Sequence, residues 1–248
     1  MKKKQWMPAL LLGVLLLVHS TAAAGAKQTV DLAEAAHLTA EQKLEGTVHN
    51  QVVYAQNGVI IWDQIIKEDA LVYHYPRIHL KNRHRAAAAI NHYFKSRASA
   101  SRQAYHKANR SQETLTSQVN YILSYHGDRY LSLREYGIDY YERAAHPSSW
   151  EQGTTFDLRN GSRVTWQELM HSEGLKPYDL KRINEKLLAS PYGLHHAFYS
   201  DFKGLNRLPE NYYLDEKGVI HFVFQQYEIA PYAAGIIDLP MCEDKEER

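Results

Sequence analysis

Apolar side chains recur at every second position through the middle of the chain, the spacing of β-strands with one face on a core. The alternation runs over residues 119–125, is interrupted by the polar stretch 126–129 and resumes over 131–133. It continues over 136–140 in the opposite phase. We therefore expect a β-bulge near residues 134–135, where one extra residue must be absorbed.

Turn and cap residues mark where this β-rich region ends. Asn160-Gly161 is typical of a two-residue hairpin turn of type I′, which needs positive φ at both positions. Thr165 and Glu168 have the spacing of a capping box and predict the start of a short helix. A last hairpin is expected over 212–224, in which 219–224 is apolar on both faces except at His221 and forms a central strand.

Apolar positions at helical spacing predict two further elements. The longer helix spans 85–109 and has a stripe formed by Ile90, Phe94, Arg97, Ser101 and Tyr105, opposite a basic side. A second helix spans 177–189 and ends before Pro191. Short strands are expected on either side of Asn57-Gly58 and at 71–73.

These elements predict an α+β fold of antiparallel sheets with helices packed on one face, in two lobes. We assign the N-terminal α+β lobe to residues 47–115 and the sheet-rich C-terminal lobe to 116–240. Residues 27–46 form a flexible lead-in and residues 241–248 a frayed tail.

Residues 1–26 have the pattern of a secretory signal peptide. Lys2-Lys3-Lys4 precede an apolar run from Met7 to Val18, and Ala24-Gly25-Ala26 offers a cleavage site. The apolar run is shorter than the roughly 20 residues that span a bilayer, so we expect no permanent membrane anchor. The mature protein is expected to be exported, to the periplasm or the extracellular side of the cell envelope.

Charge and cysteine content exclude some classes of protein. Loss of residues 1–26 removes three lysines from 29 basic residues and leaves 28 acidic ones, a formal net charge of 26 − 28 = −2. That balance does not favour nucleic acid as a partner. Cys242 is the single cysteine, so an intrachain disulfide is excluded and the fold must rest on its core.

Candidate chemistry is sparse, although the chain contains 14 histidines. No metal-ligand spacing is present, since His195 and His196 are adjacent and point apart on a helix. Thr155-Phe156-Asp157 is similar to the start of a polysaccharide deacetylase motif, but Leu158 stands where that motif has a second aspartate. His146, with serines at 148 and 149, is the alternative centre of an envelope hydrolase, without a recognisable oxyanion hole. We expect no metal and no cofactor.

Four motifs in one order resemble a known family over residues 48–239: Tyr125–Tyr130, Ala145–Pro147, Phe156–Gly161 and Tyr227–Gly235. The chain resembles the RsiV-like extracellular domain, which is also the N-terminal module of PdaC-type peptidoglycan deacetylases. The resemblance implies an α+β fold in two lobes and, as in RsiV-type anti-sigma factors, an outward domain that binds lysozyme. Only residues 1–6 precede the apolar run and no deacetylase domain follows, so the recognition role is the one expected.

The sequence thus predicts a non-catalytic binding module of the cell envelope, with a lysozyme-like protein or peptidoglycan as partner. The predicted binding residues are Glu228, Pro231 and Tyr232, with the corner at His146 and Pro147 as the next candidate. Pro231 stiffens its loop, and the small residues after Tyr232 let its ring project as an anchor. The alternative prediction for Tyr232 is that it folds back as a packing residue.

Overall fold

A computed structural model describes residues 51–110 and 114–242. The predicted signal peptide (1–26), the lead-in (27–46) and the end of the tail (243–248) lie outside the described residues. Within 51–110 and 114–242, no helix is long and apolar enough to cross a membrane.

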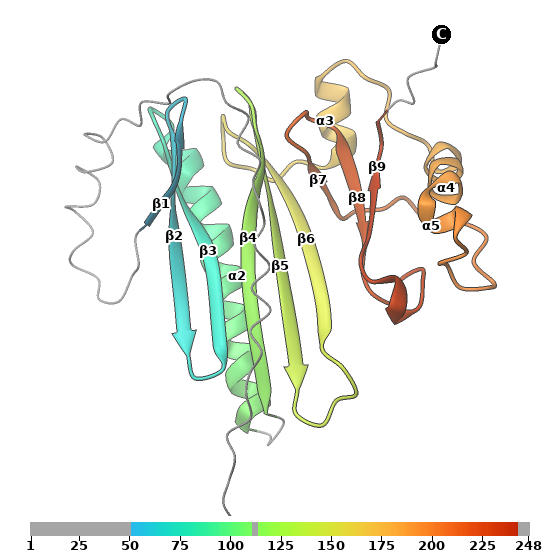
Figure 1. Ribbon diagram of the computed structural model, residues 1–248. Coiled ribbons are helices and arrows are strands. Elements are labelled where there is room, and N and C mark those ends of the chain that lie inside the picture. Colours follow the sequence, from blue (N-terminus) through green and yellow to red (C-terminus); the bar gives the residue numbers. More distant parts are fainter. Residues whose placement is uncertain (1–50, 111–113, 243–248) are drawn as a thin grey trace, which may run out of the picture.

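The first structural unit is a six-stranded sheet with the strand order β1-β2-β3-β4-β5-β6 and one long helix, α2 (Figure 1). Neighbouring strands are antiparallel except β3 and β4, whose residues 71–73 pair in parallel with 117–119. A parallel pair needs a crossover connection, and α2 provides it. The element bounds are β1 Gln51–Gln56, β2 Val59–Glu68, β3 Leu71–Leu80, α2 His84–Arg110, β4 Leu115–His126, β5 Tyr130–Tyr141 and β6 Ser148–Asp157.

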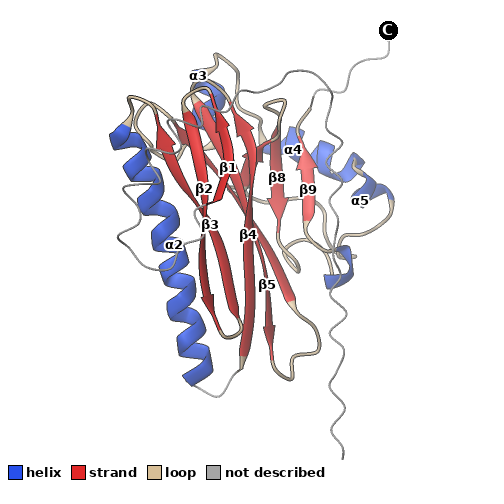
Figure 2. Cartoon of the chain, turned by 60° about the vertical axis from the view of Figure 1, so that its left-hand side comes forward, coloured by secondary structure: helices blue, strands red, loops and turns tan. Residues whose placement is uncertain are grey.

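The second unit is a three-stranded antiparallel sheet with the order β7-β8-β9 and three short helices. Figure 2 shows α2 on one side of the six-stranded sheet, and the small sheet with α4 and α5 on the other. The bounds are α3 Trp166–Ser172, α4 Leu180–Ala189, α5 Pro191–Leu194, β7 Tyr212–Leu214, β8 Ile220–Phe224, the 3₁₀ turn η2 Tyr232–Ala234 and β9 Ile237–Pro240.

The predicted α+β class is confirmed, but the structure divides the chain at a different place. The predicted boundary between residues 115 and 116 falls inside β4, which pairs with β3 on one side and β5 on the other. The sheet therefore joins the two predicted lobes, and the change from one sheet to the other comes after β6. Met241, assigned to the tail, is buried and donates its N–H to the Ile220 carbonyl oxygen.

The two units are in direct contact where β7 crosses β6. A Cβ atom at Gly153 would lie 2.0 Å from the Tyr212 carbonyl oxygen, so only glycine allows this approach. The Leu214 N–H also donates to the Ser132 hydroxyl oxygen, 3.0 Å away, across the interface.

Locally encoded features agree well with the sequence. The capping box is present, since Thr165 accepts from the Glu168 N–H and Glu168 accepts from the Thr165 N–H.

Of the two predicted type I′ turns, one is present. Asn57 and Gly58 both have positive φ, as a type I′ turn requires. At the other predicted turn of this type only Gly161 has positive φ. The type I′ prediction is wrong there because the chain makes a wider turn, with Gly161 N–H donating to the Asp157 carbonyl oxygen.

The predicted bulge near residues 134–135 is also wrong. The register shift lies in the partner strand, between Leu123 and Tyr125, and β5 alternates without interruption. Glu135 faces α2 with its side chain 1% exposed, and its Oε2 lies 2.6 Å from Arg97 Nε. Ile138 and Tyr140, which the pattern placed on the core, are exposed on the opposite face.

Candidate binding site

The corner between β5 and β6 carries two of the predicted binding residues. Residues 142–147 connect Tyr141 to Ser148, and Arg143 adopts a positive φ of 76° within the turn. His146 and Pro147 come at the end of this corner, directly before β6 begins. They therefore lie at the edge of the six-stranded sheet, next to the segment that packs against β6.

The segment after β8 packs there, because amide side chains bind the exposed backbone of β6. Gln226 Oε1 accepts from the Ser149 N–H at 2.8 Å, and Gln225 both accepts from the Glu151 N–H and donates to its carbonyl oxygen. Asn211 forms the same pair of bonds with the Gly153 N–H and the Glu151 carbonyl oxygen. We call Asn211, Gln225 and Gln226 the edge clamp, because they occupy the positions of a further strand.

The segment that follows the edge clamp places two tyrosines next to the corner. Tyr227 follows Gln226 directly, has a φ of 64°, and its hydroxyl lies 3.0 Å from His146 Nε2. The Tyr232 ring stacks on His146 with 3.8 Å between centroids, and its hydroxyl donates to the Pro147 carbonyl oxygen at 3.0 Å. We call His146, Tyr227 and Tyr232 the aromatic cluster.

The hydrogen-bond contacts of His146 indicate which of its ring nitrogens carries the hydrogen. The Pro147 carbonyl oxygen only accepts, so His146 Nδ1, at 3.1 Å, carries the hydrogen. In the neutral ring Nε2 is then the acceptor for the Tyr227 hydroxyl. The result is a surface on which Tyr227 is 53% exposed and Tyr232 is half-buried. Such a surface offers apolar ring faces and hydroxyl groups to a partner.

The structure brings three of the five predicted binding residues together: His146, Pro147 and Tyr232. The Tyr232 ring is turned onto the corner, so it is neither a freely projecting anchor nor a residue folded into the sheet. Pro231 is exposed next to it, and the Glu228 carboxylate accepts from the Gln225 N–H at 2.7 Å. Tyr227 was missed by the sequence reasoning, although it directly precedes Glu228.

The alternative of a hydrolase centred on His146 finds no support in these contacts. Among the described residues, His146 has hydrogen-bond contacts with the Tyr227 hydroxyl and the Pro147 carbonyl oxygen. Neither contact is with a serine hydroxyl or a carboxylate, the groups that flank the histidine of a Ser-His-Asp triad. Across residues 51–110 and 114–242, no three His, Cys, Asp or Glu side chains are grouped closely enough to hold a metal ion.

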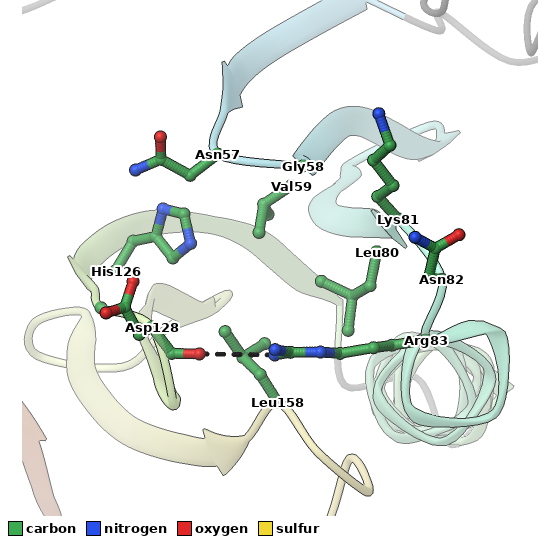
Figure 3. A pocket seen from close by; sticks show the side chains of 11 residues that line it. Asn57, Gly58, Val59, Leu80, Lys81, Asn82, Arg83, His126, Asp128 and Leu158 are labelled. Atoms are coloured by element: carbon green, nitrogen blue, oxygen red, sulfur yellow. Dashed lines mark hydrogen bonds between the residues drawn. The ribbon is translucent and has the colours of Figure 1, made fainter.

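A separate cavity of about 360 Å³ lies at the far end of the six-stranded sheet. It is walled by the turns after β1, β3 and β4, with Val59, Leu80 and Leu158 contributing apolar surface. Figure 3 shows the Arg83 side chain extending across it, where Arg83 donates to the Asp128 carbonyl oxygen. None of the predicted binding residues lines this cavity.

The fold defines an α+β protein, mostly sheet, in which a small second sheet is clamped to the edge of a larger one. Residues 175–241, which include most of that second unit, match the family described as "Protein of unknown function (DUF3298)". This description names no catalytic family. No curated protein matches the chain.

Two solved structures are similar to the chain. A member of the DUF3298 family from Bacteroides fragilis is 16% identical, with a TM-score of 0.39. A DUF3298 family protein from Pseudomonas aeruginosa is 11% identical, with a TM-score of 0.47. Each match covers 74% of this chain and 88% of the other.

Proposed function

We propose that the protein is an exported binding module of the cell envelope, without catalytic activity, that recognises a lysozyme-like protein or the peptidoglycan itself. The observation that carries this proposal is the aromatic cluster. Its residues come from segments about eighty positions apart, and the hydroxyl–imidazole, hydroxyl–carbonyl and ring-stacking contacts hold them together.

Rigidity is what makes this cluster suitable for recognition. Each side chain that a partner must immobilise costs about 0.5–1.5 kcal/mol, and rings that are already fixed avoid part of that cost. Tyrosine is also enriched among the residues that dominate binding energy at protein interfaces. Residues 227–235 and 145–147 resemble the RsiV-like domain, which binds lysozyme in RsiV-type anti-sigma factors, and this resemblance favours a protein partner over peptidoglycan.

The test uses the chain from Lys27 onward, with lysozyme as one probe and purified peptidoglycan sacculi as the other. The proposal expects one of the two to bind. Tyr227→Ala should weaken that binding by about 2 kcal/mol, or about thirtyfold in Kd, because it removes the most exposed ring of the cluster. Tyr136→Ala is the matched control, because Tyr136 is an exposed tyrosine on β5 outside the cluster.

Three results would contradict the proposal. The first is that neither probe binds. The second is that binding to one probe survives both Tyr227→Ala and Tyr232→Ala in folded protein. The third is that the native chain releases soluble fragments from the sacculi. The last result would instead favour the hydrolase alternative. Binding to only one probe assigns the partner.

A further inference from the structure

The structure contains a second cleft, away from the aromatic cluster, at the place where the six-stranded sheet opens. Pairing between β3 and β4 ends at Tyr73 and Val119. Immediately beyond, His74 on β3 and Asn120, Tyr121 and Leu123 on β4 line a cleft of about 460 Å³, together with residues of β1 and β2. This volume is within the range of small-molecule sites in proteins, about 300–1,000 Å³.

One polar group of the cleft is the imidazole of His74, whose ring is oriented by a carboxylate. His74 Nδ1 lies 2.7 Å from Asp63 Oδ2, and the Asp63 side chain is largely buried. A carboxylate accepts hydrogen bonds, so the hydrogen of the His74 ring is on Nδ1. In the neutral ring Nε2 is then an acceptor, and in the described part of the chain it has no partner.

A second polar group of the cleft is an amide. Asn120 is half-buried on β4, and among the described residues its side chain makes no hydrogen bond. An amide both donates and accepts, so Asn120 complements the acceptor at His74. His74 and Asn120 therefore both offer unused hydrogen-bonding capacity to the same cleft.

The remaining lining is mainly aromatic and aliphatic, with two buried polar atoms, the Tyr121 hydroxyl oxygen and Asp63 Oδ1. Tyr54 and Tyr121 contribute rings, and Ile61, Leu123 and Val53 contribute aliphatic surface. The Tyr54 hydroxyl is already engaged, 2.6 Å from His126 Nδ1. Asp63 is the one acidic residue in the lining, where its Oδ2 contacts His74, and the lining contains no lysine or arginine. With His74 neutral the cleft keeps the negative charge of Asp63 and disfavours an anionic ligand, while its rings and polar atoms suit a ligand with apolar faces and hydroxyl groups.

We propose that this cleft binds a saccharide unit, with His74 Nε2 accepting from a hydroxyl and Asn120 bonding a second hydroxyl or an acetamido group. The sugar's apolar face packs on the tyrosine rings, as amphipathic aromatic side chains allow. The proposal does not depend on the proposed function, since it uses no residue of the aromatic cluster.

The test is an NMR titration of the chain from Lys27 onward with the disaccharide of N-acetylglucosamine and, separately, with maltose. At least one sugar should bind in the millimolar range or tighter and shift the amide signals of 74 and 120–123. Asn120→Ala and His74→Gln should each weaken binding at least fivefold. Asn206→Ala and His171→Gln, at exposed positions outside the cleft, are matched controls and should bind normally.

Val53→Trp provides a variant that leaves the Asp63–His74 pair intact. Val53 is exposed at the cleft, so an indole there should block the cleft and abolish binding without disturbing the fold. The proposal is overturned if neither sugar binds at about 10 mM, if Asn120→Ala and Val53→Trp bind like the native chain, or if the shifted signals lie elsewhere. Tyr227→Ala should leave sugar binding unchanged, which separates this site from the proposed function.

Discussion

Replacing Arg97 with alanine should strongly destabilise the fold, because it leaves a buried carboxylate without its counter-ion. The Glu135 side chain is 1% exposed, accepts from the Tyr73 hydroxyl at 2.7 Å and lies 2.6 Å from Arg97 Nε. Removing one member of a buried ion pair costs about 3–5 kcal/mol. In a protein of this size each kcal/mol lowers Tm by about 2–4 °C, so Tm should fall by about 6–20 °C at pH 7.

Calorimetry on four proteins tests this reasoning: the native chain, Arg97→Ala, the double variant Arg97→Ala/Glu135→Gln, and Arg102→Ala. The double variant should recover much of the loss, because it no longer contains a buried charge. Arg102 is the matched control, since it also extends from α2 to a carboxylate, that of Glu68, but is 52% exposed. Its loss should cost at most about 1 kcal/mol. If Arg97→Ala is no less stable than Arg102→Ala, or the double variant no more stable than Arg97→Ala, the interpretation is wrong.

Three further predictions concern pH and the sheet edge. Burial raises the pKa of Glu135, so its carboxyl group stays protonated up to a higher pH in the native state than in the unfolded chain. The free energy of unfolding of the native chain, relative to that of Glu135→Gln, should therefore fall as pH rises from the ordinary carboxyl pKa through the raised one. Urea unfolding measures this difference, and an increase of the relative stability over that pH range would contradict the prediction. Burial alone would raise the pKa of Asp157, but hydrogen bonds led by that from Arg159 lower it. Asp157→Asn should be destabilised at pH 7 and approach native stability as pH falls through the lowered pKa; a pH-independent difference would count against this. Asn211→Ala leaves the Gly153 N–H unpaired and should cost about 1–3 kcal/mol, with faster hydrogen exchange at Gly153; native-like exchange there would argue against the edge clamp.

The error in β5 shows why a local pattern is insufficient for this sheet. The charge of Glu135 on the core face was interpreted as a break in the alternation, and Arg97 was assigned to the stripe of the long helix. In the structure Glu135 and Arg97 are the two halves of one ion pair. The two residues are 38 positions apart (135 − 97). The helical pattern around Arg97 and the strand pattern around Glu135 therefore each include only one member of the pair.

The turns and caps were predicted because their causes are local. Thr165 and Glu168 satisfy backbone groups within one helical turn, and Asn57-Gly58 determines the backbone of its own hairpin. The candidate site is different. Both of its segments were identified from the sequence, but as alternatives, because their meeting depends on how the small sheet docks against β6.

The edge clamp explains why these two segments meet and stay together. An edge strand exposes unpaired N–H and C=O groups, and proteins commonly cover such edges. Here Gln225 and Gln226 cover part of β6 and directly precede Tyr227, so the backbone of Tyr227 is kept beside the corner that carries His146. The same bonds that protect the sheet edge therefore position Tyr227, and its hydroxyl contact with His146 orients the exposed ring. The sheet edge and the aromatic cluster thus depend on the same docking of the small sheet against β6.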